Sequence, residues 1–107
     1  MKYYTKDHVW LEPDERTGKL VVGITHEGNE AMDGITYIEA ADGKLVVESV
    51  KASKEIELPV RGVMQEISMA GPVTWPRDYA VTVFEPGYEL DTSQCMDEEA
   101  YMEYARQ

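Results

Sequence analysis

Cysteine is almost absent from this sequence of 107 residues, and long apolar runs are missing altogether. The single thiol, Cys95, excludes an internal disulfide framework and a cysteine zinc cluster. The longest apolar runs, such as Leu45–Val47, are too short for a membrane-spanning helix, and the first residues lack the apolar stretch of a signal peptide. We therefore expect a cytoplasmic protein that does not enter a membrane.

Basic residues are scarce as well. The chain has 10 Lys and Arg against 21 Asp and Glu, which gives a formal net charge of −11. Phosphate backbones and anionic lipid surfaces are bound by clustered basic side chains, and this sequence has no such cluster. Nucleic acid and membranes are therefore not expected as partners. The acidic balance suits either simple solubility or docking on basic surfaces of larger proteins.

Residues with the arrangement of a catalytic or metal site are also lacking. The two histidines, His8 and His26, do not have the spacing of metal ligands, so we expect no metal. Cys95 has no evident histidine or acidic partner and is expected to be an inert packing residue. Because no nucleophile is paired with a base, an enzyme is the least expected class.

The sequence does contain many short segments of strand-forming residues, separated by turn signals. Ile35–Ile38 and Leu45–Val47 flank Asp42-Gly43, a dipeptide typical of a two-residue hairpin turn. A second reversal is expected over 50–53, and Tyr79–Phe84 is expected to be the last strand. Many short strands with frequent turns predict a mainly β domain, a small sandwich or barrel.

Two helices are expected beside these strands. Thr25 is a suitable N-cap for a short helix near 26–32. A second helix is expected from about Asp97 to Arg106, because acidic residues at its start and a basic residue at its end suit the helix dipole. The chain is thus expected to be a single domain over 1–107, with a C-terminal helical extension over about 93–107.

One motif lies at the second expected reversal, and it is followed by a Pro-Gly element. Pro59 comes eight residues after Lys51 and opens the segment Pro59–Gly62. The motif consists of Glu48, Ser49, Val50, Lys51 and Ala52. This pattern resembles the lipoyl-lysine hairpin of the glycine cleavage system H protein family, which reads E-S-V-K-A-x-S followed by P-V-S-G.

The resemblance extends over nearly the whole chain. Lys2–Trp10 is similar to the start of the family sequence, K-Y-T-x-D-H-E-W. Tyr37–Glu39 resembles its F-V-E strand, and Met96–Tyr104 resembles its C-terminal helix. The resemblance implies the lipoyl-domain fold, a barrel-sandwich hybrid.

The resemblance also implies a covalent cofactor, lipoate, in amide linkage to Lys51. A tight hairpin suits this role because its tip projects from the body and is held by two strands. The implied recognition residues flank the lysine: Glu48, Ser49, Val50 and Ala52. Lys54 is the alternative lysine, but it lies only five residues before Pro59, so we expect it to be a strand-edge charge.

The function that the resemblance implies is that of a carrier, not of a catalyst. The lipoyl arm would take an aminomethyl group from glycine decarboxylase (P protein), present it to the aminomethyltransferase (T protein) and be reoxidised by dihydrolipoamide dehydrogenase (L protein). A lipoate ligase or octanoyltransferase and a lipoyl synthase are the implied modifying enzymes. The cofactor supplies the chemistry, so the protein needs no acid, base or nucleophile of its own. A monomer suits a carrier that visits several partners.

The sequence departs from the family in one position of the implied arm cleft. Val9 stands where the family has a glutamate that helps to hold the positively charged aminomethyl group. Asp7, or Glu55 after the hairpin, could supply the charge instead. His8 is equally compatible with a place in the cleft and with a surface or capping role.

Two segments, between Glu39 and Lys51 and between Gly62 and Tyr79, are also shorter than in the family. These departures keep two alternatives open. One is an H-like lipoyl carrier outside glycine cleavage, used for sulfur transfer, redox signalling or lipoate relay. The other is an unmodified interaction domain that retains only the lipoyl fold.

Overall fold

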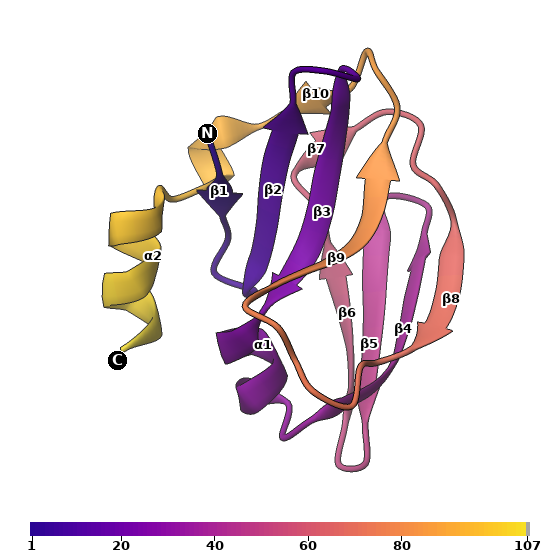
Figure 1. Ribbon diagram of the computed structural model, residues 1–107, viewed down its shortest axis with the longest axis vertical. Helices are drawn as coiled ribbons and strands as arrows, with labels where there is room; N and C mark the ends of the chain where they lie inside the picture. Colours follow the sequence, from indigo (N-terminus) through magenta and orange to yellow (C-terminus); the bar gives the residue numbers. More distant parts are fainter. Residues whose placement is uncertain (107) are drawn as a thin grey trace.

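The computed structural model describes residues 1–106, most of which lie in strands and helices (Figure 1). The strands, in chain order, are β1 (Tyr3–Tyr4), β2 (Val9–Asp14), β3 (Lys19–Thr25), β4 (Ile35–Ala41), β5 (Lys44–Ser49), β6 (Ser53–Glu57), β7 (Val60–Arg61), β8 (Ile67–Ala70), β9 (Asp78–Phe84) and β10 (Glu89–Leu90). The helices are α1 (His26–Ala31) and α2 (Glu98–Ala105), and a single 3-10 turn, η1, spans Thr92–Gln94.

Two four-stranded antiparallel sheets form the body of the molecule. One has the strand order β1-β2-β3-β9 and the other has the order β6-β5-β4-β8, while β7 and β10 pair as a short ribbon. The β7–β10 ribbon lies at one end of the sheets and the β5–β6 hairpin lies at the other (Figure 1). Within residues 1–106 no strand pairing joins the two large sheets into a closed barrel. The predicted mainly β sandwich fold is therefore confirmed.

The core lies between the two sheets and follows the alternation of side chains along each strand. In β3, Leu20, Val22 and Ile24 are buried, whereas Lys19 and Val21 are only partly covered. Side chains of β4 and β5, such as Ile38 and Leu45, face them from the second sheet. Burying one such side chain stabilises the fold by roughly 1.5–3 kcal/mol, so this pattern fixes which face of each strand points inward.

The local signals in the sequence produce the expected turns and caps. Asp42 and Gly43 have φ angles of +53° and +74°, the left-handed geometry of a type I′ hairpin turn between β4 and β5. The Thr25 hydroxyl accepts a hydrogen bond from the Gly28 N–H at 3.0 Å and caps α1. Asp97 caps α2 in the same way, accepting from the Ala100 N–H at 2.8 Å.

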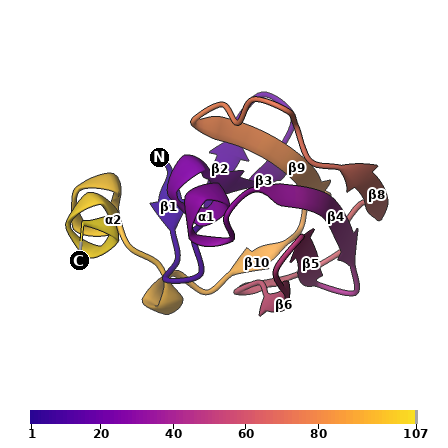
Figure 2. The same ribbon diagram turned by 90° about the horizontal axis from the view of Figure 1, so that it is seen from below.

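The C-terminal helix packs outside the sandwich. Figure 2 shows α2 beside β1, away from the space between the sheets. Its buried Tyr101 stacks on Tyr4 with ring centroids 4.6 Å apart, and both pack with Trp10 in a second, aromatic cluster. The helix occupies the expected position, while Gln107, the last residue of the expected extension, lies outside the described residues.

The sequence pattern predicted that the last strand is Tyr79–Phe84, which corresponds to β9, but the structure contains one more strand. The strand β10 follows β9 and pairs with β7, with Leu90 opposite Val60. Two residues are too few to show alternation, so this pairing leaves no trace in the sequence. No helix within residues 1–106 has the length and apolar character needed to cross a membrane.

Candidate functional site

Lys51 lies at the tip of the hairpin that joins β5 and β6. The Ser49 N–H donates to the Ala52 carbonyl at 2.8 Å, and the Ala52 N–H donates to the Ser49 hydroxyl at 3.2 Å. These bonds close the turn, and the two residues between them, Val50 and Lys51, form its tip. The side chain of Lys51 is 73% exposed, and Val50 is 92% exposed. The turn thus holds an amine and an apolar side chain in solvent on a rigid support.

The other two predicted recognition residues flank this tip. Glu48 is exposed near the end of β5, where its carbonyl accepts a hydrogen bond from the Thr36 hydroxyl at 3.1 Å. Ala52 is exposed and has no side chain beyond Cβ that could cover the amine. Directly before Glu48, the buried Val47 anchors β5 in the core. The space around Lys51 therefore fits acylation of its amine.

Asp33 is the partner of Lys51 among the described residues. Its carboxylate lies 3.1 Å from the Lys51 amine, and both side chains are largely exposed. Asp33 follows α1 in a turn and has a φ angle of +61°. Exposed ion pairs contribute about 0–1 kcal/mol, so this contact does not hold the lysine away from an enzyme. Sequence reasoning missed Asp33 because only the folded chain brings the two turns together.

Asp7 and His8 lie in the loop between β1 and β2, close to the start of β6. The Asp7 carboxylate pairs with the amine of Lys54 at 3.2 Å. Lys54 is a partly exposed side chain on β6, an edge strand of its sheet, as its sequence position predicted. The pair links the β1–β2 loop to the strand that carries the lysine hairpin.

His8 is held more firmly than Asp7. Its Nδ1 lies 2.8 Å from the hydroxyl of Tyr101, and its backbone has a φ angle of +65°. Gly28 in α1 allows the loop to come close, because an added Cβ there would lie only 2.8 Å from the Cβ of His8. Burial lowers the pKa of His8, and the positive charge of Lys54 lowers it further, against the opposing carboxylates of Glu27 and Asp7.

A hollow lies beside His8, between the two helices. It is lined by His8, Glu27, Glu30, Ala31, Tyr104 and Ala105. Glu30 is also paired with His26 one turn earlier in α1. The hollow therefore combines an imidazole, two carboxylates and an aromatic ring, and α1 leads from it directly to Asp33 and the Lys51 tip.

The structure does not bring Glu55 to this group of residues. Glu55 pairs with Lys44 at 2.9 Å, and it follows Lys54 directly in β6. Because successive side chains of a strand point to opposite faces, Lys54 faces Asp7 while Glu55 faces away from it. Val9 is fully buried in the core, so the position of the family glutamate does not line the hollow either.

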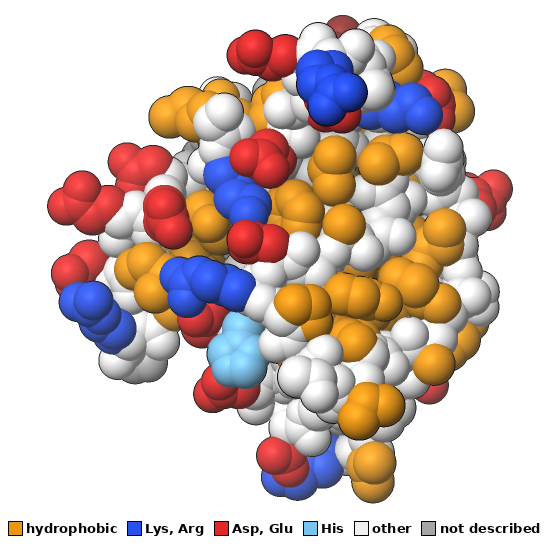
Figure 3. All heavy atoms as spheres, viewed as in Figure 1, with side chains coloured by type: hydrophobic (Ala, Val, Ile, Leu, Met, Phe, Trp, Pro, Cys, Tyr) orange, Lys and Arg blue, Asp and Glu red, His pale blue; other side chains and the backbone are white. Residues whose placement is uncertain are grey.

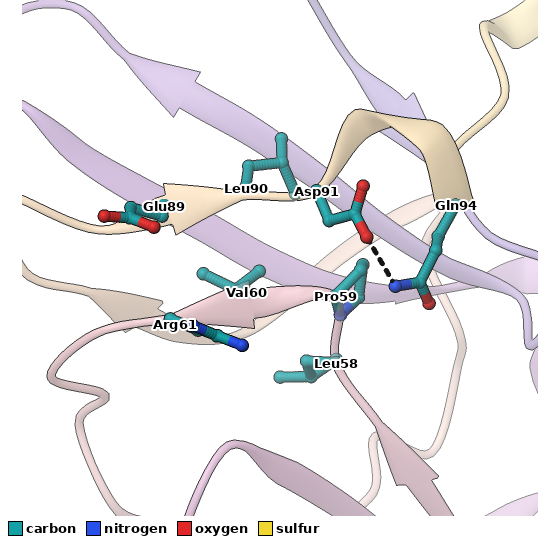
Figure 4. A pocket seen from close by; sticks show the side chains of 8 residues that line it. All are labelled: Leu58, Pro59, Val60, Arg61, Glu89, Leu90, Asp91 and Gln94. Atoms are coloured by element: carbon teal, nitrogen blue, oxygen red, sulfur yellow. Dashed lines mark hydrogen bonds between the residues drawn. The ribbon is translucent and has the colours of Figure 1, made fainter.

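A separate hollow lies at the opposite end of the sandwich. Figure 4 shows it between β7 and β10, with the Asp91 carboxylate accepting from the Gln94 side chain at 2.8 Å. Arg61 and Glu89 lie opposite one another across the two strands. The Pro59–Gly62 element that follows the motif contains β7, one strand of this ribbon, and β6 separates it from Lys51. This hollow is not part of the Lys51 site.

The single cysteine, Cys95, has the properties of a packing residue. Burial raises the pKa of Cys95, and the nearby Asp91 carboxylate raises it further, so the thiol stays protonated at neutral pH. Cys95 packs against the main core. Within residues 1–106, no three His, Cys, Asp or Glu side chains are grouped closely enough to hold a metal ion.

Acidic and basic side chains are mixed on the face that Figure 3 shows. Figure 3 shows acidic side chains around α2 at the left edge, interspersed with single basic ones, and an apolar area over the middle of the visible face. A small antiparallel sandwich with one lysine exposed on a hairpin tip has the geometry of a domain that presents a single side chain to other proteins.

Comparison with known proteins identifies the family. The chain is 31% identical to the probable glycine cleavage system H protein of Pyrococcus furiosus and 32% identical to that of Thermococcus kodakarensis, each over 97% of this chain and 89% of the relative. It is 32% identical to the glycine cleavage system H protein of Paraburkholderia phytofirmans over 92% of this chain and 89% of the relative. No family model and no solved structure matches. The chain belongs to the family of glycine cleavage system H proteins.

Proposed function

We propose that this protein is the lipoyl carrier of a glycine cleavage system and that lipoate is attached to Lys51. The observation that carries the proposal is the side chain of Lys51, which is 73% exposed at the tip of the β5–β6 hairpin within the family motif. Membership of the H protein family supports the role in glycine cleavage. The body contributes presentation of the arm and recognition by partners.

When bound, lipoate supplies a disulfide that takes up the aminomethyl group released from glycine. The residues of the chain keep the root of the arm in place: Ser49 and Ala52 close the turn, and Val47 anchors it. A tethered arm reaches each partner at a high effective concentration, so the carrier needs no catalytic group. The expected partners are the P, T and L proteins, and the expected location is the cytoplasm.

Intact mass spectrometry tests the attachment site. Protein produced with a lipoate ligase in lipoate-supplied cells should carry one lipoyl adduct. Lys51→Arg should lose this adduct, whereas Lys54→Arg, the matched change three residues away on the same hairpin, should retain it. An adduct that survives Lys51→Arg would contradict the proposed site, and the absence of an adduct under every condition would favour an unmodified interaction domain.

A second candidate is an H-like lipoyl carrier that works outside glycine cleavage. The burial of Val9 favours it, because the position of the family glutamate contributes nothing to the hollow beside His8. Purified glycine decarboxylase and dihydrolipoamide dehydrogenase distinguish the two. A carrier of glycine cleavage is a substrate of both enzymes, whereas reduction by the dehydrogenase without reaction at the decarboxylase would establish the second candidate.

A further inference from the structure

A chain of hydrogen bonds among three side chains ties the C-terminal helix α2 to the body. The hydroxyl of Tyr101 in α2 lies 2.7 Å from the hydroxyl of Thr25, at the start of α1, and 2.8 Å from Nδ1 of His8 in the β1–β2 loop. Tyr101 and Thr25 are only 1% and 2% exposed, so water does not replace a missing partner at these hydroxyls. The positions of the protons therefore follow from counting donors and acceptors.

When the His8 ring is neutral, the number of protons matches the number of contacts. The Thr25 oxygen already accepts from the Gly28 N–H at 3.0 Å, so its own proton is directed to the Tyr101 oxygen. Burial raises the pKa of Tyr101 to about 12, so this hydroxyl keeps its proton and donates it to Nδ1 of His8. Two protons thus fill two contacts, and the neutral ring carries its own proton on Nε2.

Protonation of the His8 ring removes this match. Nδ1 then carries a proton and can only donate, so three protons, from Thr25, Tyr101 and His8, compete for the same two contacts. One of them stays buried without an acceptor, or the ring turns away and Tyr101 loses its partner. Either outcome is costly for a buried hydroxyl, and the cost disappears when α2 leaves the body and Tyr101 enters water. The charged ring therefore favours a state in which the helix is released.

Charged and titratable groups surround the His8 ring on four elements. They are Asp7 on its own loop, Glu27 and Glu30 in α1, Lys54 in β6, and Tyr101 and Tyr104 in α2. Burial lowers the pKa of His8, the charge of Lys54 lowers it further, and the carboxylates of Glu27 and Asp7 oppose the shift. The Asp7 carboxylate is itself paired with Lys54 at 3.2 Å, which limits its support of a charged ring. The ring is therefore neutral at neutral pH and takes up its proton below its ordinary value of 6.5.

The other contacts of α2 permit the helix to leave while the sheets stay folded. The segment before α2 is held separately, because the Met96 N–H donates to the Tyr4 carbonyl at 2.7 Å and the Tyr4 N–H donates to the Met96 carbonyl at 2.8 Å. The helix itself packs outside the sandwich (Figure 2), and its bond from Tyr104 to the Lys6 carbonyl is exposed. A helix of 8 residues is not stable alone in water, so release also unfolds it.

We propose that His8 and Tyr101 form a pH-sensitive latch, in which protonation of the His8 ring releases and unfolds α2 while the two sheets stay folded. Release uncovers Tyr4 and Trp10, which pack with Tyr101 in the aromatic cluster of the neutral form. The latch requires no acyl group on Lys51. It therefore goes beyond the proposed function, and its failure would leave that function intact.

Amide hydrogen exchange of the unmodified full chain, followed by NMR and corrected for the intrinsic pH dependence of exchange, tests the latch. We expect the protection of the α2 amides to fall by at least about fivefold between about pH 7.5 and about pH 5, beyond any change in β3 and β5. The fall should follow the ring signals of His8 in 1H–15N spectra, which should show the Nε2–H form at neutral pH. Protection of α2 that stays constant or falls equally with that of the two strands would overturn the inference, as would a predominant Nδ1–H form.

His8→Asn separates the latch from other effects of pH. It removes the titrating ring but keeps a side-chain acceptor near the backbone, and asparagine tolerates the left-handed φ angle of +65° at this position. The protection of α2 in this variant should be the same at both pH values. The matched change His26→Asn, at the start of α1 and outside the relay, should retain the wild-type response. A wild-type response in His8→Asn would overturn the assignment to His8.

A second pair of variants tests the hydroxyl of Tyr101. Tyr101→Phe retains the ring that stacks on Tyr4 but removes the relay, so the protection of α2 should already be low at neutral pH and should depend little on pH. Tyr104→Phe removes the exposed bond to the Lys6 carbonyl and should lower the protection by the same factor at both pH values. A pH response of wild-type size in Tyr101→Phe would overturn the role of the relay.

Discussion

A turn lies at each end of the strand β5, and the two turns are closed by different means. At one end, Asp42 and Gly43 both adopt left-handed backbone angles. At the other end, Ser49 and Ala52 bond to each other, and Val50 and Lys51 remain in solvent. The first turn is specified by backbone geometry, so its residue types serve folding. The second turn is closed by residues outside the tip, so the tip residues remain available for recognition.

The largest expected effect on stability comes from truncating a core side chain next to the first turn. Leu45 is completely buried, so Leu45→Ala should lower the free energy of unfolding by about 2–5 kcal/mol. The exposed Val50 offers the contrast: Val50→Ala should change it by less than about 0.5 kcal/mol while slowing lipoylation of Lys51. Urea denaturation and timed intact-mass measurements test both effects. A comparable loss of stability in the two variants would remove the distinction between the turns.

The next effect concerns the backbone of the first turn. Gly43 has a φ angle of +74°, and no atom lies within 4 Å of an added Cβ, so strain is the only penalty of a side chain there. Gly43→Ala should therefore lower the free energy of unfolding by about 1–2 kcal/mol. The control is Ala52→Ser in the second turn, which should be nearly neutral. Thermal or urea unfolding that ranks the two variants in the opposite order would contradict this assignment.

A smaller effect is expected from pH at the loop that faces the second turn. The pKa of His8 is lowered from its ordinary value of 6.5, mainly by burial. Below about pH 6.5 the unfolded chain therefore binds more protons than the folded one, and stability should fall as the pH falls. Above that pH the contribution of His8 to stability is fully present.

His8→Gln should reduce this part of the pH dependence. Free energies of unfolding measured between about pH 5 and about pH 7.5, where histidine side chains titrate, should show the difference. His26→Gln is the comparison on the exposed face of α1. An identical pH profile for the wild-type protein and His8→Gln would show that the ring contributes no linkage.

The smallest effect is expected at the ion pair beside the tip. Asp33→Asn should lower the stability of the unmodified protein by less than about 1 kcal/mol, because both groups are exposed. The lipoylated protein should not respond to Asp33→Asn, because an amide at Lys51 carries no charge. A larger response in the lipoylated form would place Asp33 in contact with the arm itself.

Features encoded by neighbouring residues could be predicted from the sequence. Asp42-Gly43, the Thr25 cap and the reversal around Lys51 each depend on a few consecutive positions, and all three occur in the structure. The hairpin pairings of β4 with β5 and of β5 with β6 followed from the turn signals between these strands. The two-residue β7–β10 ribbon is too short to produce such a pattern.

Contacts between distant residues could not be predicted in the same way. His8 and Tyr101 are separated by most of the chain, and each has an ordinary local context. Asp33 meets Lys51 only because two turns on different strands adjoin. Glu55 was grouped with Asp7 as a possible source of charge, but the alternation along β6 directs it to Lys44. In each case the missing information is the relative placement of elements.

Because Asp33 pairs with Lys51, the surface charge at the hairpin tip differs before and after acylation of the lysine. The free amine and the carboxylate neutralise each other at the base of the tip. Converting the amine to an amide leaves the carboxylate without its counter-ion and makes the whole molecule one charge more acidic. An enzyme that attaches the arm and an enzyme that uses it would therefore meet surfaces of different polarity at the same turn, which distinguishes the finished carrier from its precursor.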